Sequence, residues 1–583
     1  MKKLLALLLA LLMVAGLLAG CSNSGEENNP SSEPGNTGSN EPTSAPTYTG
    51  PVGGDEELPD VELPLTENND QFICWIGNGQ TFQDFSTYDD NLFYQWMEEQ
   101  TGVDLVFNHP ASGSEREAFQ TMVLSGDYPD FVQSVKNYYD GGVDKAIKDE
   151  FLVALNDAVD QWMPHYRRMV YADETTFIQA VSDEGNLWAV HHIVDVPQGA
   201  WVGLGIRQDW LDRAGIDVSV AETMEGLESI LTTFKDYTYD NNGPLWMEGG
   251  SSYFGMAIIG SYGVSGTNFS NGIINENGTA VYSPLKEGYK QYAAQMQDWY
   301  NKGLIHNAYV ATASFSTPED RWANSEVGVG NFIYTNLPTL RAAAANSSLQ
   351  AEPDFNLSAL TTPKLTADQS WDDIHLRNNQ DKIRNGNSMG ITTGCKNLEL
   401  ACKFWDYAWT DEGKIASNWG PVLGDEGDTT ATYFIDESDS NHDGHKECYQ
   451  QWQMDYYGNV TNIQYKVAVH NGPTYSIWSR EWCMLTEQEI EYQNIWNRVK
   501  GDWVWPEGVT LTTQEGNDSS SPIANAQSAC NEWLVEVITQ NKSVDTYETE
   551  LVPQLESMGI ADALQLYQNA LSRYYARSQY IDD

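Results

Sequence analysis

The segment from residue 439 to residue 450, which reads DSNHDGHKECYQ, has the spacing of an EF-hand-type calcium loop. Oxygen ligands at positions 1, 3 and 5 and a glycine at position 6 turn such a loop around one ion. The twelfth position departs from the pattern because it is glutamine, and no clear helix precedes the loop. The candidate ligands are Asp439, Asn441, Asp443, the carbonyl of His445, Glu447 and Gln450. The alternative is an acidic surface turn.

A second pattern, GNSMG at residues 386–390, matches the nucleophile motif GxSxG around Ser388. That motif needs a buried strand before the serine and a helix after it. Here charged DKIR precedes and β-branched ITT follows, which reverses the required context. Glycosidases use a pair of carboxylates, and no pair can be singled out among 83 Asp and Glu residues. We therefore predict no catalytic residue, with a lipid-anchored glycoside hydrolase as an alternative.

The aromatic content favours a carbohydrate ligand. The chain has 20 Trp and 31 Tyr residues, and sugar rings stack their apolar faces on such side chains while their hydroxyls need oriented polar partners. Any single Trp is more often a core residue. As a set, the aromatics favour sugar over amino acid or metal, and a cell-surface glycan-adhesion protein is a further alternative.

Alternating strands and helices must position these residues. Residues 71–77 (QFICWIG), 103–107 (VDLVF) and 130–135 (DFVQSV) read as buried strands, separated by helical spacing that ends at Gly102 and by a capping box at Ser114 and Glu117. This order predicts an α/β fold with a parallel sheet covered by helices. Ligands of such sheets bind beyond the carboxyl ends of the strands. Candidates by position are Gly77, Asn78, Asn108 and Ser134.

The N-terminal segment predicts export. Two lysines precede an apolar run from Leu4 to Gly20, which is the layout of a secretory signal. LAGC, which ends at Cys21, resembles the lipobox of bacterial lipoproteins, so we expect residues 1–20 to be removed and Cys21 to carry lipid at the outer face of the cell membrane. An ordinary secretory signal is the alternative. Residues 21–69 are rich in Ser, Gly, Asn, Glu and Pro and read as a flexible tether.

Composition narrows the function further. The net charge of -52 repels phosphate backbones, so we exclude nucleic acid as a partner. Six cysteines besides Cys21 are too sparse for a disulfide scaffold, and none forms a CxxC pair. The part after the tether exceeds what one hydrophobic core usually spans, which predicts two lobes.

Several segments in order resemble the family 1 extracellular solute-binding proteins of bacterial ABC importers, the maltose-binding-protein-like group. They include YQWMEEQTGVDLVF, MVLSGDYPDFV, GIRQDWLDRAGI, CKNLELACKFWDYAWTDEGKIASNWG and LVPQLESMGIADALQLYQNALSRYY. The resemblance implies a two-lobed periplasmic-binding-protein-like fold of type II topology with an interlobe cleft. It further implies a monomeric, lipid-anchored receptor that captures an oligosaccharide for ABC transporter permease subunits, without an organic cofactor. Related lipoproteins carry a calcium loop after FKD, where this chain reads YTYDNNGPLW.

The resemblance also places lobes and ligand contacts. Lobe 1 is expected at 70–200 and 386–470, and lobe 2 at 201–385 and 471–583, with crossings near 200–205, near 384–388 and after the 436–450 loop. Trp75 and Trp419 are expected as stacking positions on one lobe, exposed in the open state, and Arg207 as a hydrogen-bond donor. The other ligand-binding candidates are Asn78, Ser134, Trp246, Tyr253, Trp371 and Arg377.

Overall fold

The computed structural model describes residues 58–197, 199–247, 256–264, 272–308, 317–375, 381–438 and 444–581. All described residues belong to one compact unit, Ala45–Asp583. Within these residues, every helix is too short or too polar to cross a bilayer.

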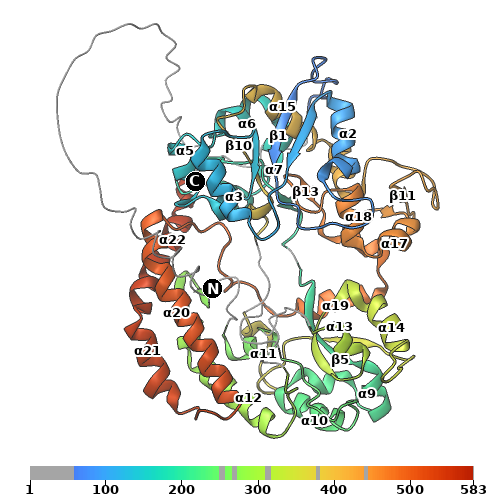
Figure 1. Cartoon of the computed structure of the whole chain (residues 1–583), viewed down its shortest axis with the longest axis vertical. Helices are drawn as coiled ribbons and strands as arrows, with labels where there is room; N and C mark the ends of the chain where they lie inside the picture. The colour runs from blue at the N-terminus through green and yellow to red at the C-terminus, as the bar shows by residue number, and fades with distance from the viewer. Residues whose placement is uncertain are drawn as a thin grey trace, which may run out of the picture. The chain divides into compact units, whose positions relative to one another are not determined.

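Lobe 1 is built on a four-stranded sheet with the order β10–β3–β1–β2 (Figure 1). The strands are β1 (Gln71–Trp75), β2 (Asp104–Asn108), β3 (Phe131–Gln133) and β10 (Met389–Ile391). Strand β1 pairs in parallel with β2 and β3, which confirms the parallel sheet predicted from the sequence. Strand β10 comes from a distant segment and pairs antiparallel with β3.

Helices cover this sheet, and their ends follow local sequence signals. Asn91 caps α2, whose last turn ends at Gly102 in the left-handed conformation with φ 73°. The capping box predicted at Ser114 is wrong, because the Ser114 side chain makes no cap hydrogen bond. The lobe 1 helices are α2 (Leu92–Thr101), α3 (Glu115–Ser125), α4 (Val135–Tyr138), α5 (Gly142–Lys148), α6 (Asn156–Trp162), α7 (Pro164–Val170), α8 (Glu174–Ala180), α15 (Leu398–Tyr407), α16 (Asp411–Trp419), α17 (Gln451–Tyr457) and α18 (Val460–Val467).

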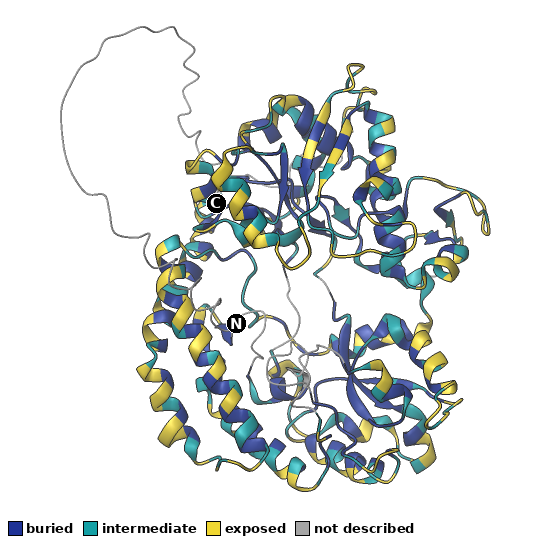
Figure 2. Cartoon of the chain, in the orientation of Figure 1, coloured by how far each residue is buried: buried dark blue, intermediate teal, exposed yellow. Residues whose placement is uncertain are grey.

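Lobe 2 has a three-stranded antiparallel sheet with β5 (Val202–Arg207) in the centre, between β8 (Val329–Ile333) and β9 (Leu357–Leu360). All six residues of β5 are buried, as the dark strand in Figure 2 shows. A hairpin of β6 (Ile273–Glu276) and β7 (Thr279–Tyr282) lies apart from this sheet. The helices up to the third crossing are α9 (Gln208–Ala214), α10 (Met224–Phe234), α11 (Met256–Ile259), α12 (Glu287–Asn301), α13 (Glu319–Ala323) and α14 (Leu337–Ala345).

Three crossing segments connect the lobes and lie against one another. The first leaves lobe 1 after β4 (Ile193–Val194), and the third leaves it after β13 (Tyr475–Ser476), which pairs in parallel with β4. The second crossing joins them, because Val194 N donates to Lys382 O at 2.9 Å. The third crossing, which the sequence left open, is therefore near residues 475–486, before α19 (Glu487–Trp496) of lobe 2.

Two segments pack differently from their predicted assignment. Tyr475 and Ile477 pack with lobe 1 residues although residues 471 onward were predicted for lobe 2. Val61 and Leu65 pack against the lobe 1 core, and Leu65 N donates to Thr101 O at 2.8 Å. Residues 61–65 are therefore part of lobe 1 and not tether, because the apolar residues of VELPL find a surface to cover.

The last elements form a helical arm. It comprises α20 (Thr513–Ile538), α21 (Val552–Ser557), α22 (Ile560–Ala576) and the short helix η11 (Arg577–Tyr580). Ile523 of α20 and Ile560 of α22 lie in the lobe 2 core. Tyr580 and Ile581, in contrast, pack against the lobe 1 core.

Candidate ligand-binding site

The carboxyl ends of the parallel strands of lobe 1 meet at one edge of the sheet. Trp75 of β1 is opposite Asn108 of β2 and Val132 of β3. Because β10 runs antiparallel, its first residue, Met389, pairs with Gln133 at the same edge. Ligands of open α/β sheets bind outside this edge. The second and third crossings also begin or end here, so chain segments far apart in sequence converge on it.

Three amide side chains form a connected group at this edge, which we call the amide cluster: Gln133, Asn387 and Asn471. The Gln133 amide, only 6% exposed, donates to the carbonyls of Asn387 at 3.4 Å and Asn471 at 3.3 Å. Asn387 Nδ2 donates to Asn471 Oδ1 at 3.1 Å. Asn387 and Asn471 are half-buried. Each amide combines two donors with an acceptor, which matches the mixed donor and acceptor character of sugar hydroxyls.

Ser134, which the sequence analysis chose by position, lies beside the amide cluster. Its backbone is left-handed, with φ 62° and ψ 23°, which is uncommon for a residue with a side chain. Its hydroxyl donates to Gly386 O at 2.6 Å, and its amide donates to Ser388 O at 3.4 Å. Such local strain occurs often at ligand sites. Through these two hydrogen bonds to Gly386 and Ser388, the second crossing holds the end of β3 in place.

Ser388 itself is a structural residue. It is fully buried, and its hydroxyl donates to Arg384 O at 3.0 Å while accepting from His192 N at 3.2 Å. The contact with His192 connects the first and second crossings, and the contact with Arg384 lies within the second. The serine of the GNSMG motif therefore organises the backbone at this edge.

Half-buried tryptophans lie on the crossings. Trp478 of the third crossing donates its backbone amide to Asp195 Oδ1 of the first at 2.9 Å. A Cβ on Gly199 would lie 3.1 Å from Trp478 Nε1 and 2.9 Å from the Asn497 amide, so a larger residue there would displace these side chains. Within the described residues, Trp478 Nε1 is buried without a hydrogen-bond partner. Trp482 Nε1 donates to Gln493 Oε1 at 3.2 Å.

Burial keeps two ionisable groups of this region uncharged. His192 contacts Gly472 O through Nδ1 at 2.8 Å, and burial, followed by the nearby Arg480 and Arg384 charges, lowers its pKa to about 3. Burial raises the pKa of Glu481, on the third crossing, to about 8. At neutral pH both side chains are mainly neutral, so the charges that remain beside His192 are those of Arg384 and Arg480.

Trp75 and Trp419 are core residues of lobe 1, which contradicts the expectation that their rings face solvent. Trp75 is 5% exposed and lies edge-on to Phe119 and Tyr138, with ring centroids 5.7 and 6.3 Å apart. Trp419 is 1% exposed and packs in a separate cluster with Tyr449. The two rings do not form one floor, because different helices cover them.

Arg207 also has a structural role. It is fully buried and is the last residue of β5. Its guanidinium donates to both carboxylate oxygens of Asp209, at 2.8 and 2.6 Å, and lies over the rings of Trp210 and Phe355. These contacts hold the turn from β5 into α9. We correct the predicted role of Arg207 as a ligand donor accordingly.

The remaining candidates are dispersed. Trp246 is buried beside His306. Trp371 is half-buried near the second crossing, with Lys364 Nζ 4.6 Å and Arg498 Cζ 5.2 Å from its ring centroids. Asn78 donates to Ser86 O at 2.8 Å within lobe 1. Tyr253 and Arg377 lie outside the described residues, as does Cys21.

The candidate calcium loop connects two strands and not two helices. Asp439, Asn441 and Asp443 lie outside the described residues, and the loop joins the antiparallel strands β11 (Tyr433–Ile435) and β12 (Glu447–Tyr449). Gly444 has φ 91°, as a glycine at position 6 allows. The other three predicted ligands are His445, whose ring faces Trp419 at 5.6 Å, Glu447 on β12, and the buried Gln450.

Gln450 is already engaged elsewhere. Its Oε1 accepts from Gly427 N at 2.9 Å, and its Nε2 donates to Asp425 O at 3.0 Å. This side chain holds the 425–427 loop, so its predicted role as the twelfth calcium ligand is wrong in this arrangement.

Within the described residues, one further group has metal-ligand character: Asp240, His306 and Glu326. Asp240 belongs to the YTYDNNGPLW segment. His306 Nε2 lies 3.6 Å from Asp240 Oδ2 and 4.0 Å from Glu326 Oε2. Arg321 pairs with Glu326, and this guanidinium already supplies positive charge to the group. We therefore interpret the group as an ion-pair network.

The chain matches known proteins over most of its length. The family described as bacterial extracellular solute-binding protein matches residues 79–415. The fructooligosaccharide ABC transporter substrate-binding protein FusA of Streptococcus pneumoniae serotype 4 is 21% identical over 570 residues, which cover 90% of this chain and 94% of FusA.

Solved structures share the fold. The crystal structure of S. pneumoniae FusA with kestose has a TM-score of 0.63 at 17% identity, covering 87% of this chain and 100% of the other. The alginate-binding protein AlgQ2 without calcium ion has a TM-score of 0.62 at 19% identity, covering 87% and 99%. A FusA EF-hand mutant in complex with fructo-nystose is also similar, at 16% identity and TM-score 0.60, covering 87% and 99%. These neighbours have the two-lobed periplasmic-binding-protein fold.

Proposed function

The chain is a bacterial extracellular solute-binding protein, and from this membership we propose that it captures an oligosaccharide at the amide cluster for an ABC transporter. One observation carries the location: Gln133, Asn387 and Asn471 join the end of β3 to the second crossing and to the segment just before β13, from which the third crossing starts. The match to FusA, a fructooligosaccharide-binding protein, supports the ligand class.

The proposed mechanism is closure of the lobes around the ligand. Ligand contacts that exist only in the closed conformation shift the population towards it. Hydroxyls of the sugar would exchange hydrogen bonds with Asn387 and Asn471, and an apolar sugar face would stack on a tryptophan of a crossing, with Trp478 and Trp482 as the candidates. Binding leaves the glycosidic bonds intact, since the proposal assigns no acid or nucleophile.

Isothermal titration calorimetry with kestose as the first probe, followed by a panel of neutral oligosaccharides, tests this function. Asn387→Ala and Asn471→Ala should each weaken binding by roughly fivefold to tenfold, because each removes a hydrogen bond worth about 1 kcal/mol. Asn346→Ala is the matched control, since Asn346 bonds Ala342 O at the end of α14 in lobe 2. Absence of binding to every oligosaccharide, or release of hydrolysis products on long incubation, would contradict the proposal.

We further propose that Cys21 anchors the protein by lipid to the outer face of the cell membrane. Support comes from the apolar run and the LAGC sequence before the cysteine. Mass spectrometry of the protein from its native membrane should find a lipid-modified N-terminus at Cys21. An unmodified N-terminus beyond Cys21 would exclude the anchor.

We also propose that the 439–450 loop binds a calcium ion with a structural role. It is supported by the spacing of the oxygen ligands and by the positive φ of Gly444. Because Gln450 is committed to the 425–427 loop, Glu447 is the better candidate for closing the coordination sphere.

A further inference from the structure

The C-terminal arm spans both lobes as a helix. Helix α22 has 17 residues, which is about 25 Å at 1.5 Å per residue. Its beginning, at Ile560 and Ala563, is part of the lobe 2 core. The chain then continues through η11 to Tyr580 and Ile581, which pack against the lobe 1 core. Unlike the three crossings, which consist of extended segments and short 3-10 turns, this connection is a continuous helix and cannot flex in its middle without breaking backbone hydrogen bonds.

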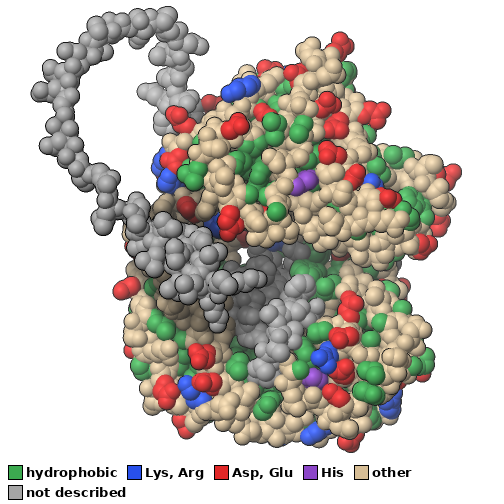
Figure 3. Space-filling view, in the orientation of Figure 1, with side chains coloured by type: hydrophobic (Ala, Val, Ile, Leu, Met, Phe, Trp, Pro, Cys, Tyr) green, Lys and Arg blue, Asp and Glu red, His purple; other side chains and the backbone are tan. Residues whose placement is uncertain are grey.

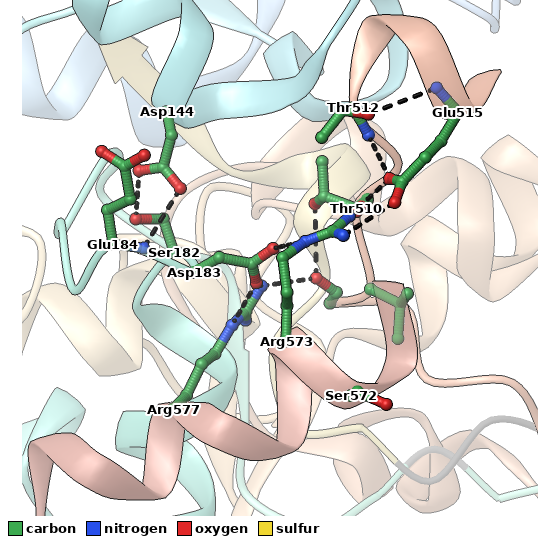
Figure 4. Close-up of polar contacts among 12 residues, drawn as sticks. Asp144, Ser182, Asp183, Glu184, Thr510, Thr512, Glu515, Ser572, Arg573 and Arg577 are labelled. Atoms are coloured by element: carbon green, nitrogen blue, oxygen red, sulfur yellow. Dashed lines mark hydrogen bonds and ion pairs between the residues drawn. The ribbon is translucent and has the colours of Figure 1, made fainter. Parts of the chain in front are cut away.

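An arginine on the last turn of the arm binds lobe 1. Arg577 is 3% exposed, and its Nε and Nη2 donate to Asp183 Oδ1 at 2.9 and 2.7 Å (Figure 4). Asp183 follows α8 in lobe 1. Nη2 of Arg577 also donates to Gly508 O at 2.8 Å. Removing one partner of a buried charge pair strongly destabilises the folded protein, because the other charge is left buried without a partner.

A second arginine, one helical turn earlier, extends the contact to α20. Arg573 donates to both carboxylate oxygens of Glu515, at 2.8 and 2.6 Å, and to Thr510 O at 3.0 Å. Its Nε contacts Asp183 Oδ2 at 3.3 Å. Glu515 also accepts from Thr512 N at 2.8 Å in the capping box that begins α20. Asp183 therefore connects lobe 1 to α22 and η11, and Arg573 extends this connection to Glu515 of α20 (Figure 4).

Lobe 1 is shaped to receive the segment that precedes α20. Gly142 has φ 79°, and a Cβ there would lie 2.2 Å from Thr510 Cγ2. Lys136 Nζ donates to Val509 O at 3.0 Å. Asp381 of the second crossing accepts from Glu507 N at 2.5 Å. Two independent features, a close backbone approach and buried polar contacts, thus fix this segment next to the second crossing.

We propose that the contact of Arg573 and Arg577 with Asp183 is the fixed pivot of the interlobe motion. In this proposal the three crossings bend, while the arm keeps its contacts with lobe 1 in both the open and the closed state. Arg573, Arg577 and Asp183 are then positioning residues, which set the angle between the lobes without touching the ligand. The pivot itself does not depend on which ligand binds.

The test uses the free, full-length protein. Asp183→Asn removes the shared negative charge while preserving shape, and Arg577→Gln removes the matching positive charge. We expect both variants to raise the radius of gyration in small-angle X-ray scattering. In hydrogen–deuterium exchange, the amides of 174–184 and 572–581 should exchange roughly tenfold faster or more, while those of α10 in lobe 2 should not change.

Controls separate a pivot from a simple loss of stability. Glu399→Gln breaks an exposed ion pair with Lys403 inside α15 and should change neither measurement. Arg577→Lys, which retains the positive charge, replaces Arg577→Gln in both measurements if the glutamine variant fails to fold. Unchanged scattering, or faster exchange spread evenly over both lobe cores, would overturn the pivot. If the parent protein binds kestose, the same variants should change the affinity for kestose at least threefold. This affinity measurement alone rests on the proposed function.

Discussion

At the scale of single residues, burial decides what a tryptophan does. The sequence correctly indicates an aromatic-rich chain, but it does not show which rings are covered. Trp75 follows the alternation of β1, and its side chain points to a helix-covered face of the sheet instead of the strand-end edge. Neighbouring Gln133 and Ser134 lie at that edge, and position at a strand end was sufficient to find Ser134. Asn387 and Asn471 were missed because only the folded crossings bring them there.

The first prediction concerns these buried rings. Trp75→Ala and Trp419→Ala should each lower the free energy of unfolding by about 3–5 kcal/mol, because truncating a buried aromatic side chain leaves a cavity. Urea denaturation followed by circular dichroism measures this change. Trp478→Phe should instead reduce oligosaccharide affinity with a smaller loss of stability. A Trp75→Ala variant as stable as the parent, yet unable to bind kestose, would restore Trp75 as a stacking position.

The second prediction concerns His192. Its pKa is lowered from 6.5 to about 3 in the folded protein, so between these values the unfolded chain binds more protons than the folded one. The stability contributed by neutral His192 is therefore full above pH 6.5 and falls as the pH decreases towards 3.

His192→Gln, which retains a donor for Gly472 O, should lose less stability between pH 7 and pH 5 than the parent in thermal melts. Burial raises the pKa of Asp381 and Glu507, and these carboxyls act in the opposite direction in both proteins. Their contributions to the pH dependence of stability cancel when the parent and the variant are compared. Parallel pH profiles for parent and variant would show that His192 does not titrate with unfolding.

At the scale of elements, local patterns predicted three strands of the lobe 1 sheet and none of the lobe 2 sheet. Strands β1, β2 and β3 and helix α2 follow from periodicity and from Gly102. Strand β10 and the sheet of β5, β8 and β9 did not, because their partners are far apart in the chain and short strands carry little pattern of their own. The third crossing was equally hidden, since β4 and β13 have two residues each.

The third prediction concerns the loop between β11 and β12. If it holds calcium, a chelator should lower the melting temperature, because an ion that binds only the folded state stabilises it. Asp443→Ala should melt like the chelated parent and respond no further to chelator. Gln450→Glu is a useful companion, because it should disturb the 425–427 loop without improving calcium affinity. Identical melting curves with calcium and with chelator would remove the site.

At the scale of the whole molecule, length and resemblance predicted two lobes, and the two separate cores bear out that organisation. Acidic side chains are spread over both lobes on the face shown in Figure 3, in keeping with the net charge of -52. The division into lobes could be predicted because core size is limited. The helical arm could not, since nothing in the periodicity of α22 shows that its two ends serve different cores.

The fourth prediction is ligand-driven closure. Saturating kestose, or whichever neutral oligosaccharide calorimetry identifies, should decrease the radius of gyration of the parent in small-angle X-ray scattering. Asn471→Ala at the same sugar concentration should show a smaller decrease because fewer molecules are occupied. A ligand that binds with high affinity and leaves the scattering curve unchanged would contradict closure.

The interleaving of the lobes along the chain has a consequence for biogenesis. Lobe 1 needs β10 at residues 389–391 to complete its sheet, and it needs Tyr580 and Ile581 to cover its core. During export the chain emerges from its N-terminus, so lobe 1 cannot reach its final packing until nearly all of the polypeptide has crossed the membrane. The segments of lobe 1 that are exported first must therefore remain outside the cell without their native neighbours, and the dense negative charge of the chain helps to keep them from associating.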